Sequence, residues 1–177
     1  MVRAACLQRQ RSYAPDMTSA TQGVARVRVA APAECIYALI SDVSRMGDWS
    51  PETDKCEWLD GATSAAVGVR FRGANHLGPV RWRTECTITA ATPGDEFAFS
   101  VMHPDGREET RWRYLLTPTE TGTEVVESYE FLWCPLANRI LETLIPRDRQ
   151  LRRGIQQTLT TLAAAAEAAY AASLQRP

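Results

Sequence analysis

One stretch of the sequence decides the fold: residues 69–133 read VRFRGANHLGPVRWRTECTITAATPGDEFAFSVMHPDGREETRWRYLLTPTETGTEVVESYEFLW. Apolar and polar residues alternate along it, which is typical of β-strands with one buried face and one face in water. Short links rich in Gly, Pro and Asp interrupt the alternation. Because parallel strands require long crossover connections, these links predict an antiparallel meander. The five predicted strands are Val69–Asn75, Val80–Ala90, Glu96–His103, Glu109–Thr117 and Thr123–Trp133.

The segments on either side of this meander contain the remaining elements. Two further strands are predicted at Ala25–Val29 and Lys55–Leu59, with two small helices between them, at Ala33–Ile40 and around Val43–Met46. After the meander, Leu136–Ile145 is predicted as a helix, and a long helix follows from residue 147 to about residue 170. One apolar stripe of the long helix comprises Leu151, Ile155, Leu159, Leu162 and Ala166. Together these elements predict an α+β fold with about seven antiparallel strands.

Length and composition indicate one globular domain, because the chain has 177 residues, of which 45% are hydrophobic and 23% are charged. We expect residues 1–22 to form a disordered or flexible tail, residues 23–172 the domain, and residues 173–177 a C-terminal tail. An upstream start codon, with the natural start at Met17, is an alternative reading of the first stretch. The 20 basic and 21 acidic residues nearly cancel, so nucleic acid is not an expected partner. No integral membrane segment is expected either, since no apolar run approaches the roughly 18 residues of a span.

The cysteines and the absence of known motifs reduce the kinds of metal, cofactor and catalytic site that the sequence predicts. The five cysteines are scattered, no C-x-x-C pair occurs, and only two histidines are present, so we expect no metal site. An odd number of cysteines is consistent with a cytoplasmic location. Nucleotide-binding loops, nucleophile elbows and zinc-protease motifs are absent from the sequence. We therefore expect no cofactor.

The order of elements resembles the START-like (SRPBCC) superfamily, whose helix-grip fold wraps a curved sheet around one long C-terminal helix. Residues 29–51, VAAPAECIYALISDVSRMGDWSP, resemble the opening of that family, which joins the first strand to the small helices. Residues 67–99, VGVRFRGANHLGPVRWRTECTITAATPGDEFAF, and 111–131, RWRYLLTPTETGTEVVESYEF, resemble the meander of its bacterial polyketide cyclase/dehydrase branch. Relatives in the superfamily include cyclases, hydrolases and lipid carriers, so the resemblance implies a fold more specifically than a function.

The alternation assigns an inner face to each strand, and on the last strand it takes one carboxylate inside. Glu127 shares its face with Val125, Tyr129 and Phe131, and this aromatic row has to be the inner one. A buried carboxylate is costly unless it is paired or protonated. Three readings remain open. In the first, Glu127 forms a structural hydrogen bond or ion pair with Tyr114, a backbone amide or an arginine. In the second, it contacts a ligand or acts as an acid/base. In the third, a bulge turns its side chain outward.

A sheet curled around one helix leaves internal space, so we predict a mainly apolar cavity between the sheet and the C-terminal helix. Its few polar points are expected to be Asn75, His103, Glu127 and Tyr129. The catalytic candidates are Glu127, His103 and Tyr129. The candidate ligand-binding residues are Trp49, Phe71, Asn75, Trp82, Phe99, Trp112, Tyr114, Glu127, Tyr129, Phe131, Trp133, Leu151 and Ile155.

Three functions compete at this stage. The first is binding of a hydrophobic small molecule, such as a lipid, a polyketide or an aromatic metabolite, by a monomer or homodimer. The second is a polyketide cyclase or dehydratase that uses Glu127 with His103 or Tyr129 to move a proton. The third is a non-enzymatic protein-partner module, which would use an arginine-rich outer face: Arg70, Arg72, Arg81, Arg83, Arg111 and Arg113.

Overall fold

The computed structural model describes residues 22–133 and 147–175, and its centre is one antiparallel sheet. The strand order across the sheet is β1-β7-β6-β5-β4-β3-β2, so the first strand pairs with the last. From β2 to β7, each strand pairs with its neighbour in sequence. This is the arrangement expected of a meander, whose successive strands are antiparallel. The strands are β1 (Gln22–Val29), β2 (Thr53–Trp58), β3 (Arg70–Leu77), β4 (Val80–Thr92), β5 (Glu96–Met102), β6 (Glu108–Thr119) and β7 (Gly122–Phe131).

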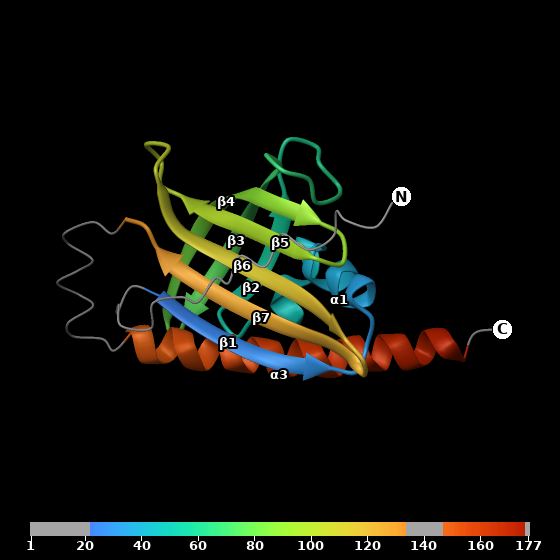
Figure 1. Cartoon of the computed structure of the whole chain (residues 1–177). Helices are drawn as coiled ribbons and strands as arrows, with labels where there is room; N and C mark the ends of the chain where they lie inside the picture. Colours follow the sequence, from blue (N-terminus) through green and yellow to red (C-terminus); the bar gives the residue numbers. More distant parts are fainter. Residues whose placement is uncertain (1–21, 134–146, 176–177) are drawn as a thin grey trace, which may run out of the picture.

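Helices cover one face of this sheet (Figure 1). After β1 come the short helix α1 (Ala33–Ile40) and the 3-10 helix η1 (Val43–Asp48), and the long helix α3 (Arg147–Leu174) ends the described chain. Figure 1 shows β1 beside α3, with α1 near one end of the sheet. The apolar stripe of α3 packs inward, since Leu159, Leu162 and Ala166 are fully buried. Thus the sheet and α3 enclose the interior between them.

The predicted helix-grip α+β fold is confirmed, and the predicted elements agree with the structure within a few residues at their ends. The predicted short helix is a 3-10 helix that continues to Asp48. The last strand ends at Phe131, two residues before the predicted end. The predicted helix Leu136–Ile145 lies outside the described residues, as do residues 1–21. Within the described part of the chain, no helix has the length and apolar character needed to cross a membrane.

The pairing of the strands is irregular at both edges of β5. The β4–β5 pairing shifts register between Ile88 and Ala90, with the extra residue on β4. The β5–β6 pairing shifts next to Val101 and Met102, where the extra residue, Glu109, is on β6. Such bulges increase local twist and redirect the strand. β5 ends at Met102, so His103 lies beyond the strand, in the link between β5 and β6.

The outer face of the sheet has arginines that pair with nearby carboxylates. Arg72 contacts Glu85 at 2.8 Å, and Arg113 contacts Glu96 at 2.6 Å. The remaining outer pairs include Arg70 with Asp60, Arg81 with Asp54 and Arg111 with Glu108. Exposed pairs of this kind are worth about 0–1 kcal/mol each. Most of the arginines on this face have an acidic side chain beside them, which offsets their positive charge.

Candidate functional site

A cavity of about 620 Å³ lies between the inner face of the sheet and α3. Its wall includes residues of η1 and the loop after it, of strands β2 to β7, and of α3, which contributes Leu151, Gly154, Ile155 and Thr158. Pockets for small molecules occupy about 300–1,000 Å³ in proteins. The volume is therefore sufficient for a ligand of drug-like size.

Aromatic rings from adjacent strands form the apolar part of this wall. Phe71 and Phe99 meet edge to face with ring centroids 5.2 Å apart, and Phe99 stacks on Trp112 at 6.5 Å. Phe99 and Trp112 are direct partners in the β5–β6 ladder, which explains why their rings lie side by side. Trp82 and Phe131 complete the aromatic lining. These rings offer wide apolar surfaces to a ligand.

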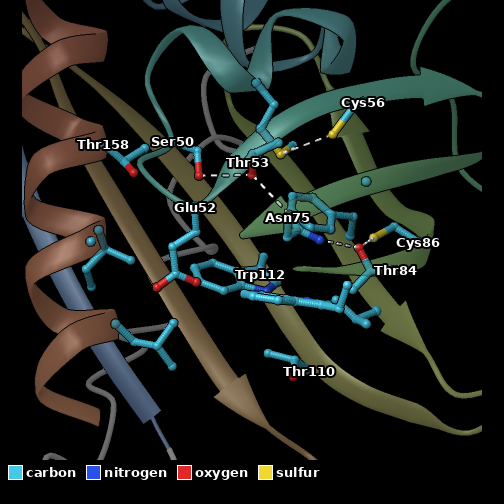
Figure 2. Close-up of a pocket in the computed structure, with 18 of the residues that line it drawn as sticks. Ser50, Glu52, Thr53, Cys56, Asn75, Thr84, Cys86, Thr110, Trp112 and Thr158 are labelled. Carbon is cyan, nitrogen blue, oxygen red and sulfur yellow. Dashed lines mark hydrogen bonds between the residues drawn. The ribbon is translucent and has the colours of Figure 1, made fainter. Parts of the chain in front are cut away.

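A row of neutral polar side chains forms another part of the wall, across β2, β3 and β4 (Figure 2). The Thr53 hydroxyl lies 3.1 Å from Ser50 Oγ and 3.3 Å from Asn75 Oδ1, and Asn75 Nδ2 donates to Thr84 Oγ1 at 3.1 Å. Figure 2 shows Thr158 on α3 facing the strands that carry Asn75 and Thr84. We call Ser50, Thr53, Asn75 and Thr84 the polar row. Its members satisfy one another by hydrogen bonds, so a ligand is not required to pair them.

Glu127 and Tyr114 form a buried pair in the same cavity wall. They are direct partners in the β6–β7 ladder, and both side chains lie on the inner face. The Tyr114 hydroxyl donates to Glu127 Oε1 at 2.7 Å, and only 2% of Glu127 is exposed. Of the three readings from sequence, the structure therefore places Glu127 inward and gives it Tyr114 as a partner.

Burial controls the protonation of this pair. Loss of solvation raises the pKa of Glu127 from its ordinary value of 4.5 to about 8, although the hydrogen bond from Tyr114 acts in the opposite direction. Burial, together with the nearby carboxyl, also raises the pKa of Tyr114 well above 10. At neutral pH both groups therefore keep their protons. A protonated carboxyl is a hydrogen-bond donor as well as an acceptor.

The sequence named His103 as one residue that could move a proton together with Glu127, and the structure gives His103 other partners. His103 lies just past the end of β5, outside the set of residues lining the cavity. Its Nδ1 is 2.9 Å from Asp105 Oδ1, and its ring packs edge to face on Trp133 at 4.8 Å. Proton transfer between two side chains requires contact at about 3 Å, and the contact that the structure gives Glu127 is with Tyr114.

Three other predicted ligand contacts lie elsewhere than in the cavity wall. Trp133 follows the end of β7 and packs against the β5–β6 hairpin, where the Arg107 guanidinium lies 4.1 Å from its ring centroid. Trp49 is buried directly after η1, with Arg45 over its ring. Tyr129 is on the inner face, but its ring lies against Gly23, where an added Cβ would come within 2.4 Å of Tyr129 Cε1. It packs instead between Trp112 and Phe131.

The remaining predicted contacts do line the cavity: Phe71, Asn75, Trp82, Phe99, Trp112, Tyr114, Glu127, Phe131, Leu151 and Ile155. The predicted ligand contacts did not include the two glycines in the wall, Gly73 and Gly154, although alternation places Gly73 on the inner face of β3. A Cβ at Gly154 would touch just one described neighbour, Pro51 Cγ at 3.8 Å. A glycine inside an otherwise regular helix costs about 1 kcal/mol relative to alanine, and this was the signal available in the sequence.

Cysteines and acidic groups in the described residues do not form a metal site. No group of three or more His, Cys, Asp or Glu residues is arranged there to hold a metal ion. Cys56 and Cys86 line the cavity, and burial raises the pKa of each thiol to about 12. Since the thiolate is the reactive form, these two residues are inert packing groups.

Comparison with known proteins agrees with this architecture. The family model described as polyketide cyclase / dehydrase and lipid transport matches residues 20–167. The matched range contains all seven strands, both short helices and most of α3. Among curated proteins, none matches the chain.

Several solved structures are similar to the chain. The polyketide-cyclase-like protein Cgl2372 from Corynebacterium glutamicum is 28% identical with a TM-score of 0.54, over 87% of this chain and 93% of that one. TTHA0849 from Thermus thermophilus is 19% identical with a TM-score of 0.61, over 84% and 98%. The di-domain ARO/CYC StfQ from the steffimycin biosynthetic pathway is 14% identical with a TM-score of 0.65, over 88% and 52%. The last two show the fold alone.

Proposed function

Because the chain belongs to the polyketide cyclase/dehydrase and lipid transport family, we propose that its cavity binds a hydrophobic small molecule, such as a lipid, a polyketide or an aromatic metabolite. The observation that carries this proposal is the cavity of about 620 Å³ with an aromatic wall. Transfer of apolar surface from water into such a site is favourable by about 25 cal/mol per Å². A ligand that covered the rings of Phe71, Phe99 and Trp112 would gain this free energy.

The position of the cavity also supports the proposal, because a ligand in solvent can reach it. Val80 lines it and is 59% exposed, so the wall continues to the surface near the β3–β4 hairpin. Leu77, at the other side of that hairpin, lines it too. An apolar rim of this kind is expected where an apolar ligand enters.

The proposal can be tested by placing a larger side chain on α3, so that it occupies part of the cavity. We would titrate N-phenyl-1-naphthylamine, a neutral probe whose fluorescence rises in apolar surroundings, into the wild type and the variant Gly154→Leu. Gly154 lines the cavity and has space for a side chain, and leucine favours helix, so the variant is expected to fold. Ala164→Leu is the matched control, because Ala164 is exposed on the same helix.

The proposal predicts saturable binding to the wild type and to Ala164→Leu, and binding at least ten-fold weaker to Gly154→Leu. Circular dichroism and thermal unfolding would verify that all three proteins are folded. Equal affinity of all three would locate the probe elsewhere and would contradict the proposal. Failure of the wild type to bind would contradict it as well.

Catalysis of cyclisation or dehydration is the second candidate, and the Glu127–Tyr114 pair is the observation that favours it. A group with a pKa of about 8 both gives and takes a proton near neutral pH. Here Tyr114, rather than His103 or Tyr129, is the partner in hydrogen-bond contact. Under this candidate Glu127→Gln would lose turnover of a polyketide substrate while keeping its affinity. Under the carrier proposal no turnover exists to be lost.

A further inference from the structure

One oxygen of Glu127 has no partner among the described residues. Oε1 accepts the hydrogen bond from Tyr114, whereas Oε2 is buried and makes no hydrogen bond. Buried polar atoms are nearly always paired in folded proteins, so an exception calls for an explanation. Glu127 is one of the residues that line the cavity, so the unpaired atom belongs to a side chain of the cavity wall.

The hydrogen bond from Tyr114 settles which atom of the carboxyl can donate. The Tyr114 hydroxyl points its proton at Oε1, so Oε1 acts as the acceptor of the pair. The proton of a neutral carboxyl then resides on Oε2, the oxygen without a partner. The group is therefore an O–H donor that lacks an acceptor among the described residues.

We propose that Glu127 determines ligand specificity by donating a hydrogen bond from Oε2 to a carbonyl oxygen of the otherwise apolar ligand. This inference rests on the proposed function, because it names the polar group that such a ligand carries. The carbonyl lies against Glu127, and the body of the ligand lies along the aromatic wall. Hydrocarbons fit the same space but leave the donor unpaired.

The surroundings of Glu127 favour a neutral acceptor. Across the ladders its neighbours are Ala25 on β1 and Tyr114 on β6. From α3 the cavity is lined by Leu151, Gly154, Ile155 and Thr158, which do not titrate. No described cation contacts the carboxyl, and loss of solvation keeps the proton on it. Elsewhere the charged groups in the wall are Glu52, Arg83 and Glu109.

Protonation makes this recognition depend on pH. Below a pH of about 8 the carboxyl keeps its proton and donates. Above that pH it becomes a carboxylate, which repels a carbonyl oxygen. The preference for the carbonyl ligand is therefore present at pH 6 and absent at pH 9.5, where the same cavity still accepts hydrocarbons.

The test uses two probes of nearly equal shape, 9-fluorenone and fluorene, which differ by one carbonyl oxygen. Dissociation constants would be measured by calorimetry for the wild type, Glu127→Gln and Glu127→Leu at pH 6 and pH 9.5. Glutamine keeps an acceptor for Tyr114 and an N–H donor for the ligand, and it does not titrate. Glu124→Gln, on the outer face of the same strand, is the control.

The proposal predicts that the wild type binds fluorenone about five-fold more tightly than fluorene at pH 6, the equivalent of one neutral hydrogen bond. The preference disappears at pH 9.5, persists at both pH values in Glu127→Gln, and is absent from Glu127→Leu. The infrared carbonyl band of bound fluorenone shifts to lower frequency in the wild type and not in the leucine variant.

Other outcomes overturn the inference in distinguishable ways. If the wild type binds both probes equally at pH 6, the cavity binds apolar ligands and the role of Glu127 is wrong. Tighter binding of 9-aminofluorene than of fluorenone would show that the carboxylate recognises a cation instead. Failure of every probe to bind would contradict the proposed function, and this inference with it.

Discussion

The buried carboxyl of Glu127 makes the stability of the protein depend on pH, and replacing it with glutamine isolates that dependence. Its pKa is raised from 4.5 to about 8 in the folded chain. The folded state therefore binds the proton more tightly than the unfolded state. Its contribution to stability is complete below pH 4.5 and decreases as the pH rises toward 8.

The magnitude follows from proton linkage. Between these two pKa values the free energy of unfolding decreases by about 1.4 kcal/mol per pH unit, since one proton is released on unfolding. From pH 5 to pH 7 the wild type loses about 3 kcal/mol relative to Glu127→Gln. In a domain of this size that loss is a decrease of about 6–12 °C in Tm.

The assay is thermal or urea unfolding of the wild type and Glu127→Gln at half-unit steps from pH 4.5 to pH 8.5. The quantity of interest is the difference between the two proteins at each pH, because other titrating groups contribute equally to both. Glutamine introduces its own packing difference, but that difference does not change with pH. Glu124→Gln, on the outer face of the same strand, is expected to follow the wild type.

A constant difference between the wild type and Glu127→Gln across this pH range would refute the reasoning. It would mean that the carboxyl titrates at the same pH in the folded and unfolded chains. A wild type that gains stability relative to the variant as the pH rises would contradict the sign.

Three further predictions concern neighbouring residues. Tyr114→Phe removes the hydrogen bond that lowers the pKa of Glu127, so ¹³C NMR should detect titration of the Glu127 carboxyl at a higher pH than in the wild type. An unchanged titration midpoint would be inconsistent with a hydrogen bond between Tyr114 and Glu127. Gly154→Ala should raise the free energy of unfolding by about 1 kcal/mol, since alanine favours helix and its Cβ would make an ordinary contact with Pro51 at 3.8 Å. Urea unfolding measures this change, and a loss of stability would contradict the prediction. Cys56 and Cys86 should resist iodoacetamide at pH 8 in the native protein and react after unfolding, as peptide mass spectrometry can show; rapid native labelling would disagree with their burial.

Much of the sheet could be predicted because its signals are local. Alternation placed Phe71, Phe99 and Glu127 on the inner face, and each is buried there. The pairing of Tyr114 with Glu127 was also within reach. Thr119 pairs with Gly122, so a two-residue turn sets the register of this hairpin and brings the two residues opposite each other.

The predicted site residues that lie outside the cavity wall depend on features other than alternation. β5 ends at Met102, so His103 lies in the link to β6 and does not continue the row of inner side chains that includes Phe99 and Val101. Trp133 lies past the end of β7, where the backbone amides of residues 132 and 133 both bond to the Glu109 carbonyl. Tyr129 has the predicted face, but its ring occupies the space above Gly23 on a strand that is distant in sequence. These placements depend on tertiary packing.

The most direct test of the central claim, that the cavity holds the ligand, is the location of a bound apolar probe by isotope-filtered NMR. The measurement would record contacts between unlabelled 9-fluorenone and the ¹³C-labelled protein. We predict contacts to Phe71, Trp112 and Ile155, which line the cavity from β3, β6 and α3. Contacts confined to exposed side chains such as Val67, at a probe concentration that saturates binding, would contradict the claim.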